Sequence, residues 1–137
     1  GLGDVYKRQI ADRFHFTGFL RGEDVHKMFQ LSDVYVMPSV SEPFGISPLE
    51  AMRSNVPVII SKQSGVAEVL DYAVKVDYWD VDALADAIFA LIEYPALGKM
   101  FASKGLEEVT NLKWNDAAAK IKTVYETAIE ENQKKTK

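Results

Sequence analysis

The chain has 137 residues, of which 47% are hydrophobic, and its formal net charge is −4. This length suits one modest domain with a core of its own, and the negative charge argues against nucleic acid as a partner, since phosphate neutralisation needs clustered Lys and Arg. The lack of cysteine excludes disulfides and thiolate metal sites, and no apolar run approaches the ~20 residues of a membrane-spanning helix.

The first nine residues do not begin with Met and run Gly-Leu-Gly-Asp-Val-Tyr-Lys-Arg-Gln. They resemble translated adaptor sequence, and the alternative is a native Gly-x-Gly turn after a lost strand. We therefore expect residues 1–9 to be a non-native or truncated lead-in and residues 10–137 to be the domain. No signal peptide is visible, and we expect a cytoplasmic protein.

Residues 13–17 alternate in character, which predicts a strand with Phe14 and Phe16 on one face and His15 on the other. We interpret His15 as a strand residue rather than a catalyst. A loop over 18–22 leads to a helix from Glu23 to Leu31. Its expected inner face comprises Val25, Met28, Phe29 and Leu31, with His26 in solvent.

A buried strand is predicted over 33–37, followed by a polar loop that turns at Pro43 and Gly45. A helix then begins at Ser47, which suits an N-cap, with Pro48 at the first helical position. The helix N-terminus offers free N–H groups and a partial positive charge, which suit phosphate. Alternatively, Ser47 and Glu50 form a capping box, in which the Glu50 carboxylate bonds back to the Ser47 N–H group.

The helix is expected to end near Ser54, with Asn55 in a left-handed cap and Pro57 blocking continuation. Residues 58–60 are all apolar and predict a strand buried on both faces. A loop over 62–65, a short helix to residue 70 and a weaker strand over 73–76 follow. Three helices then begin at Asp80 or Asp82, at Pro95 and near Trp114. Their expected inward residues are Leu84, Ile88, Leu91 and Ile92; Leu97, Met100 and Phe101; and Ala117, Ala118, Ile121, Tyr125, Ala128 and Ile129.

This alternation of strands and helices predicts a parallel sheet with right-handed crossovers. Ligands of such sheets bind beyond the carboxyl ends of the strands. We therefore expect the loops at 18–22, 38–47 and 61–65 to meet at one edge of the sheet.

Two glutamates, one in the second loop and one in the helix that follows, are separated by seven residues, within Glu42-Pro-Phe-Gly45 and Leu49-Glu50-Ala-Met52. This pattern resembles the motif of retaining nucleotide-sugar glycosyltransferases of family 4. The resemblance implies an α/β fold, a Rossmann-like parallel sheet with flanking helices that forms the C-terminal half of a GT-B glycosyltransferase. It implies hexosyl transfer with retention from a nucleotide diphosphate sugar, which is a substrate, with no cofactor and no metal.

The resemblance also assigns roles to residues. Glu50 would accept hydrogen bonds from the ribose hydroxyls, and Glu42 would hold a hydroxyl of the donor sugar at the catalytic centre. The backbone N–H groups of Phe44, Gly45 and Ile46 would contact the sugar. The N–H groups at the start of the helix would contact the diphosphate. The residues at the helix start are Ser47, Pro48 and Leu49. The loop that would lie beside the nucleotide base comprises Phe19, Leu20 and Arg21. That loop could instead be an ordinary strand-to-helix turn.

Two mechanisms stay open: Glu42 as nucleophile, or front-face transfer in which a leaving phosphate oxygen takes the acceptor proton. In the family, an Arg and a Lys that bind the diphosphate come from a segment before the first strand seen here. An N-terminal domain also precedes that strand. We expect both to be missing, which would leave an unpaired sheet edge and a fragment that is inactive alone.

The expected partners are thus a nucleotide sugar donor, an unknown acceptor and the missing N-terminal domain. Any peripheral membrane contact would come through that missing half. The alternative functions are a non-catalytic sugar-nucleotide sensor or scaffold and, less favoured, another GT-B enzyme such as a phosphorylase.

Overall fold

The computed structural model describes residues 10–135, without the side chains of residues 114–116, 134 and 135. The expected lead-in at residues 1–9 lies outside the described residues. The described elements, in chain order, are η1 (Ala11–Arg13), α2 (Glu23–Gln30), β1 (Tyr35–Met37), α3 (Ser47–Arg53), β2 (Val58–Ser61), η2 (Gly65–Glu68), β3 (Val74–Val76), α4 (Val81–Glu93), α5 (Pro95–Asn111) and α6 (Trp114–Lys135).

The described strands form one parallel sheet in the order β1-β2-β3. Ile59 of β2 lies between Val36 of β1 and Val74 of β3. All four residues of β2 are buried, whereas those of β1 are only half-buried. The predictions of parallel strands and of a central strand covered on both faces are therefore confirmed.

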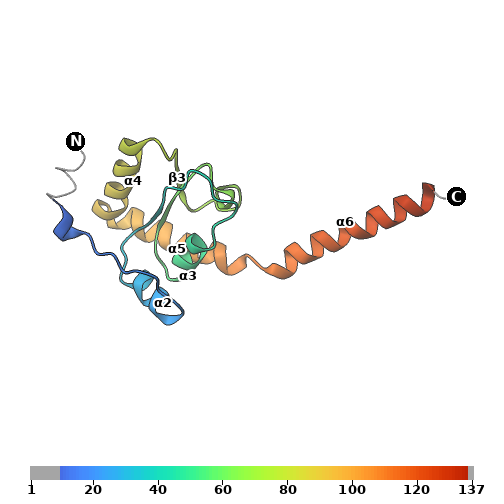
Figure 1. Cartoon of the computed structure of the whole chain (residues 1–137), viewed down its shortest axis with the longest axis horizontal. Coiled ribbons are helices and arrows are strands. Elements are labelled where there is room, and N and C mark those ends of the chain that lie inside the picture. Colours follow the sequence, from blue (N-terminus) through green and yellow to red (C-terminus); the bar gives the residue numbers. More distant parts are fainter. Residues whose placement is uncertain (1–9, 136–137) are drawn as a thin grey trace.

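Helices cover both faces of the sheet (Figure 1). On one face, Val58 and Ile60 pack with Ala51 and Met52 of α3 and with Val109 of α5. On the other face, side chains of α4 pack against alternate positions of the strands, and the start of α5 joins them. The apolar residues of this second core include Ile59, Val76, Leu84, Ile88, Leu91, Leu97 and Phe101.

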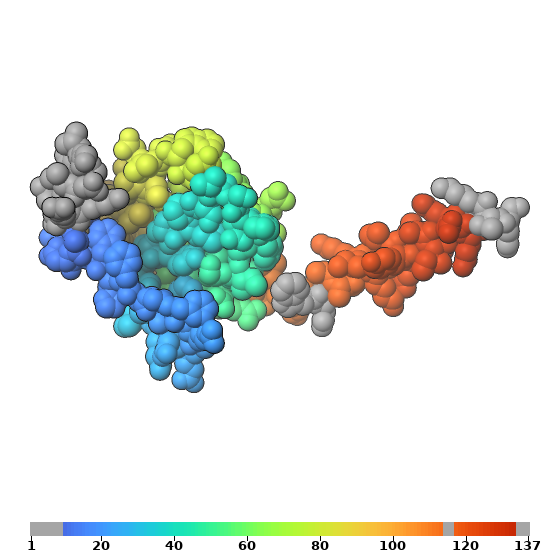
Figure 2. Space-filling view, viewed as in Figure 1, coloured from blue at the N-terminus to red at the C-terminus, as the bar shows by residue number. Residues whose placement is uncertain are grey.

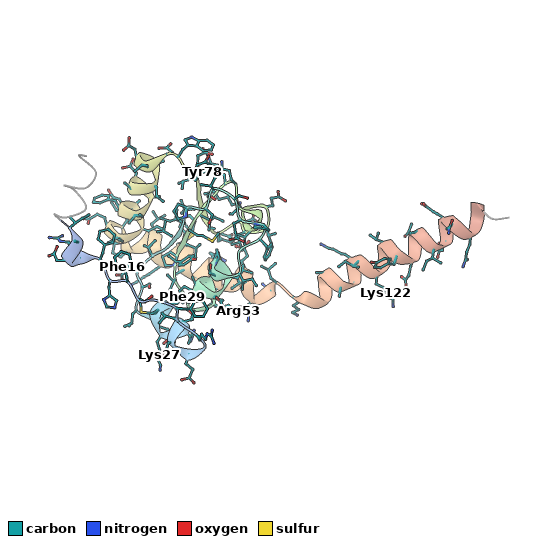
Figure 3. All side chains as sticks on the ribbon, in the orientation of Figure 1. Phe16, Lys27, Phe29, Arg53, Tyr78 and Lys122 are labelled. Carbon is teal, nitrogen blue, oxygen red and sulfur yellow. The ribbon has the colours of Figure 1, made fainter. Side chains whose placement is uncertain are left out.

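Helix α2 packs beside α3. Its Phe29 points toward the body of the domain, where its ring meets the Tyr35 ring edge-on at 5.5 Å (Figure 3). Leu31 is 80% exposed. Its assignment to the inner face is wrong, because α2 ends at Gln30 and Leu31 follows as the C-cap.

The predicted strand at 13–17 is wrong. Arg13 ends η1, and residues 14–17 have no regular structure. The Phe16 side chain, labelled in Figure 3, is 90% exposed, and that of Phe14 is 59% exposed. A strand needs hydrogen bonds to a neighbouring strand, and none of the described strands pairs with this segment.

The predicted starts of α4 and α5 are close to the observed ones, and the Asp80 carboxylate caps α4 by accepting a hydrogen bond of 3.0 Å from the Ala83 N–H group. Ile92 and Met100 were expected inside but are 55% and 42% exposed. The other predicted inward residues of the two helices, Leu84, Ile88, Leu91, Leu97 and Phe101, do pack into the second core. The buried stripe of these helices is therefore narrower than their apolar sequence suggested.

Helix α6 projects away from the body of the domain, so that the molecule has a compact part and a long arm (Figures 1 and 2). Every side chain of α6 that the structure describes is exposed, including Ile121, Tyr125 and Ile129. These residues lie in a helix, as predicted. The prediction that they pack against the domain is wrong, because they are exposed. Among the described residues, no helix has the length and apolar character needed to cross a membrane.

Candidate functional site

The loop at 38–46 connects the end of β1 to the start of α3 and carries Glu42. It folds back on itself at Gly45, whose φ of 86° is in the left-handed region. A Cβ atom at Gly45 would lie 3.0 Å from Met37 Cε and 3.1 Å from Glu42 Cγ. Glycine thus permits both the turn and the close approach of Glu42 to the backbone of the loop.

This loop is fixed to the segment that follows β2. The Gly65 N–H group donates to the Glu42 carbonyl oxygen at 2.9 Å, and the Val66 N–H group donates to the Phe44 carbonyl oxygen at 2.9 Å. Glu42 and Ser64 form an isolated parallel bridge. A Cβ atom at Gly65 would collide with the Pro43 carbonyl oxygen. The expected meeting of the loops at 38–47 and 61–65 is therefore confirmed.

Two buried serines reinforce this contact. The Ser61 hydroxyl donates to the Ser39 carbonyl oxygen at 2.6 Å, and the Ser64 hydroxyl donates to the Ser61 carbonyl oxygen at 2.8 Å. Their side chains are 0% and 2% exposed. Our reading of the sequence missed this role, although a serine directly after three buried apolar residues was a signal for a buried hydrogen bond.

Helix α3 does not begin as predicted. Ile46 is the N-cap residue, and no described side chain forms a capping hydrogen bond with this helix. The Ser47 hydroxyl instead meets the Tyr35 hydroxyl at 2.7 Å. The Ser47 cap and the capping box with Glu50 are therefore wrong, because the phenol of β1 takes the hydroxyl that would have capped the helix.

The N–H groups available at the helix start also differ from the expectation. Pro48 has no N–H group and is buried, and the Leu49 N–H group already donates to the Ile46 carbonyl oxygen at 2.9 Å. The resemblance implied that the backbone of Pro48 and Leu49 contacts the diphosphate through N–H groups. Neither residue has a free N–H group for this contact. Ser47 keeps the free N–H group among these three residues.

Four consecutive N–H groups, from Phe44 to Ser47, have no hydrogen-bond acceptor in the part of the chain that the structure describes. The carboxylates of Glu42, which is half-buried, and Glu50, which is exposed, likewise form no hydrogen bond or ion pair with described residues. Successive backbone N–H groups near a helix start bind anions and polar oxygens. The loop and the start of α3 therefore combine backbone donors with two carboxylate acceptors that have no partner among the described residues.

The loop at 18–22 does not join this arrangement. The Arg21 guanidinium lies 5.0 Å from the centre of the Phe19 ring, and Phe19 is 84% exposed. In the described structure no hydrogen bond, ion pair or ring contact links Phe19, Leu20 or Arg21 to residues 38–50. The expected meeting of all three loops thus holds for two of them.

A charged cluster lies where β2 and β3 end. The Lys62 ammonium donates to the Asp77 carboxylate at 2.8 Å, and the Gln63 amide donates to it at 2.9 Å. These hydrogen bonds, with that from Lys62 the larger, hold the pKa of Asp77 below its usual value. Within the described residues, no group of three or more His, Asp or Glu side chains is placed to hold a metal ion.

A sequence model of the family described as glycosyl transferases group 1 matches residues 4–108. An uncharacterized glycosyltransferase of Methanocaldococcus jannaschii is 28% identical over 130 residues, which cover 91% of this chain and 33% of that protein. The chain thus spans about a third of the length of this relative.

Solved structures give the same picture. Sucrose-phosphate synthase from Thermosynechococcus elongatus superposes with a TM-score of 0.76 at 30% identity, covering 94% of this chain and 33% of that one. Anabaena HepE, solved in complex with UDP-glucose, has a TM-score of 0.68 at 24% identity, covering 80% and 32%. The structural neighbours are GT-B glycosyltransferases, which confirms the predicted fold class.

Proposed function

The chain belongs to the family of glycosyl transferases group 1, and from that premise we propose that its loops at 38–47 and 61–66 form the donor side of a nucleotide-sugar site. The observation that carries this proposal is the run of four N–H groups from Phe44 to Ser47, near the carboxylates of Glu42 and Glu50 in the sequence, all without a hydrogen-bond partner among the described residues. Such a site offers acceptors to sugar hydroxyls and donors to sugar and phosphate oxygens.

Each group has a proposed partner on the donor. The Glu50 carboxylate accepts two hydrogen bonds from the vicinal hydroxyls of the ribose, and the Glu42 carboxylate accepts one from the transferred sugar. The N–H groups of Phe44, Gly45 and Ile46 face the sugar. The Ser47 N–H group reaches the diphosphate, with the partial positive charge of the helix start behind it.

We propose a transfer with retention, as the resemblance to family 4 implies. The bond between the anomeric carbon and the phosphate oxygen breaks, and the acceptor oxygen bonds to the same face of that carbon. The acceptor proton passes to the leaving phosphate oxygen, so the products are a glycoside and a nucleotide diphosphate. The loop lowers the barrier by holding donors where charge develops on the departing phosphate.

The remaining parts of this activity belong to a longer protein. The chain covers 33% of the Methanocaldococcus relative and 33% of the sucrose-phosphate synthase chain. We propose that the part outside this chain supplies the acceptor site and the basic side chains for the diphosphate. The 137-residue chain alone then has negligible transferase activity.

The test uses the longer protein, incubated with UDP-, GDP- and ADP-hexoses and a panel of acceptors, with the anomeric configuration of the product read by NMR. We expect one donor class to be consumed, a product that keeps the donor configuration, and at least a hundredfold lower turnover for the Glu42→Ala variant. Donor binding without any transfer would instead support the non-catalytic sensor. Inversion would contradict the proposed mechanism.

A further inference from the structure

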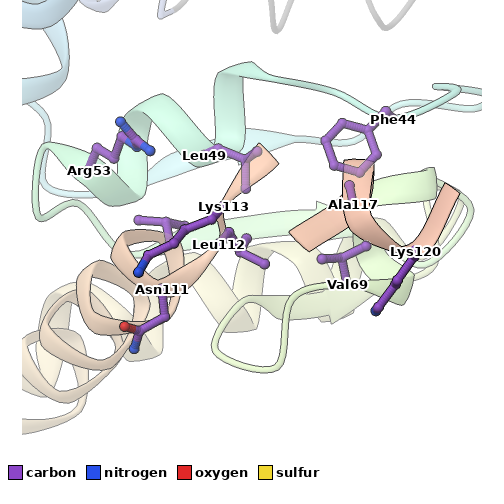
Figure 4. Close-up of a pocket in the computed structure, with 10 residues that line it drawn as sticks. Phe44, Leu49, Arg53, Val69, Asn111, Leu112, Lys113, Ala117 and Lys120 are labelled. Atoms are coloured by element: carbon purple, nitrogen blue, oxygen red, sulfur yellow. The ribbon is translucent and has the colours of Figure 1, made fainter. Parts of the chain in front are cut away.

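A cavity of about 500 Å³ opens between α3, the residue that follows η2, and the junction of α5 with α6 (Figure 4). Its volume lies within the range of small-molecule sites, roughly 300–1,000 Å³. Glu42 and Glu50 are not among the residues that line it. The cavity is therefore separate from the two carboxylates of the proposed donor site, although Phe44 and Leu49 contribute side chains to it.

The floor of the cavity is apolar. Val109 of α5 is 1% exposed and belongs to the core, and Leu49 of α3 packs against the same core. Val69 and Leu112 are 40% and 38% exposed, because the open cavity lies beside them. Covering these side chains with an apolar ligand would remove their surface from water, which is favourable.

The remaining lining carries positive charge. Arg53 comes from α3, Lys113 from the link between α5 and α6, and Lys120 from α6. In Figure 4, Arg53 and Lys113 lie toward one end of the cavity with Asn111, and Lys120 lies at the other. Among the side chains that the structure describes, none of those that line the cavity is acidic. This is a local excess of cations on a chain whose net charge is −4.

These cations have no ion-pair partner among the side chains that the structure describes. Other lysines of the chain do have one: Lys62 pairs with Asp77, Lys104 with Glu107 and Lys122 with Glu126. Three cations without an ion-pair partner among the described residues, placed around an apolar floor, present a surface complementary to a molecule with an anionic end and an apolar body.

We propose that this cavity binds an amphiphile with one apolar chain and a phosphate monoester head. The apolar chain covers Leu49, Val69 and Leu112, and the head lies at the end of the cavity that holds Arg53 and Lys113. A phosphate monoester suits this end better than a carboxylate, because it carries close to two negative charges at neutral pH and three acceptor oxygens. An Arg guanidinium can bind two of those oxygens at once.

The test measures binding to the 137-residue chain by NMR, with dodecyl phosphate below its micelle concentration as the probe. Inorganic phosphate presents the head alone, and dodecyl maltoside presents the same chain on an uncharged head. We expect dodecyl phosphate to shift the amide signals of residues 49–53, 69 and 109–120 and to bind at least tenfold more tightly than either control. Equal binding of dodecyl maltoside, or equal binding of inorganic phosphate, would overturn the proposal.

A second experiment tests the contribution of the three cations together. The triple variant Arg53→Gln, Lys113→Gln, Lys120→Gln changes exposed side chains only and should weaken dodecyl phosphate binding at least tenfold. The control Lys99→Gln changes an exposed lysine of α5 outside the cavity and should bind normally. Unaltered binding by the triple variant would also refute the assignment. Because none of these residues is Glu42 or Glu50, this result does not depend on the outcome for the donor site.

Discussion

At the scale of single residues, Gly65 controls how the loop at 38–46 is held. Its N–H group bonds to the Glu42 carbonyl oxygen, and its Cα faces the Pro43 carbonyl oxygen with no room for a methyl group. The position of Glu42 therefore depends on a glycine that follows a different strand.

We predict that Gly65→Ala lowers the free energy of unfolding by about 1–3 kcal/mol, as overpacking a tight site does. The added Cβ must push the loop away from η2. Urea unfolding followed by circular dichroism measures the change. Ser103→Ala, on the exposed side of α5, is the control and should stay within about 0.5 kcal/mol of the parent chain. A Gly65→Ala chain as stable as this control would show that the contact is not tight.

The Asp77 carboxylate gives the chain a specific acid sensitivity. Its pKa is lowered in the folded state by the hydrogen bonds from Lys62 and Gln63. A carboxyl group with a depressed folded pKa stabilises the fold fully above its unfolded pKa, near 3.8, and loses this contribution as the pH falls through the lower folded value.

We therefore predict that Asp77→Asn flattens the fall in melting temperature between neutral pH and the region below 3.8. Thermal melts at a series of pH values measure the slope. Asp86→Asn, an exposed change on α4, should leave the slope as it is in the parent chain. High salt should reduce the difference, because the pair is partly exposed. Identical slopes for the two variants would contradict the assigned role of Asp77.

At the scale of elements, the helix that carries Glu50 is positioned by α5. Met52 is 1% exposed, and its Cε atom would lie 2.8 Å from a Cβ atom at Gly105 of α5. This close packing of α3 on α5 fixes the orientation of the helix start, and hence the place of the free N–H groups.

We predict that Met52→Ala lowers the free energy of unfolding by about 2–5 kcal/mol, the usual cost of a large cavity in a core. Met100→Ala is the matched control, since Met100 is 42% exposed, and should cost about 0.5 kcal/mol or less. Chemical denaturation of both variants measures the two losses in the free energy of unfolding. Similar losses for the two methionines would mean that α3 does not depend on this packing.

Local patterns predicted the elements that depend on local interactions. The apolar run at residues 58–60 lies in the buried central strand β2, and Asn55 has the left-handed φ of 61° expected of a cap. Distant contacts decided the rest. The sequence around Ser47 does not reveal that Tyr35 takes its hydroxyl. The alternation at 13–17 does not reveal whether a partner strand lies beside it.

The position of the candidate site was predictable from the sequence, but its set of free N–H groups was not. The motif located Glu42 and Glu50, and the α/β pattern placed their loop beside the one that follows β2. The pattern could not show which N–H groups stay free, because this depends on where α3 begins. Ile46 rather than Ser47 is its N-cap, and the Leu49 N–H group is occupied as a result.

At the scale of the whole molecule, a compact α/β body carries an extended arm, α6 (Figure 1). The body is held by the two cores on either side of the sheet. The described side chains of α6 are exposed along its length, so the helix gains little from tertiary packing. Its stability is therefore expected to be lower than that of the body.

We predict that trypsin cleaves first after Lys113, Lys120 or Lys122 and leaves a body fragment that resists further digestion. Mass spectrometry of a time course identifies the sites. The lysines of the body serve as internal controls, since Lys62 and Lys104 lie within or beside packed elements. Early cleavage after these two lysines, at the same rate as in α6, would show that the body and the arm open together.

The proposed donor site depends most on Glu50, whose carboxylate we assign to the ribose. The decisive measurement is donor affinity by calorimetry in the longer protein, with the Glu50→Ala variant compared with Glu68→Ala, an exposed control on η2. Loss of charged hydrogen bonds predicts a deficit of about 1.5–3 kcal/mol for Glu50→Ala, or roughly ten- to 150-fold weaker binding. Glu68→Ala should bind normally. If both variants bind the donor as tightly as the parent protein does, the proposed nucleotide-sugar site is wrong.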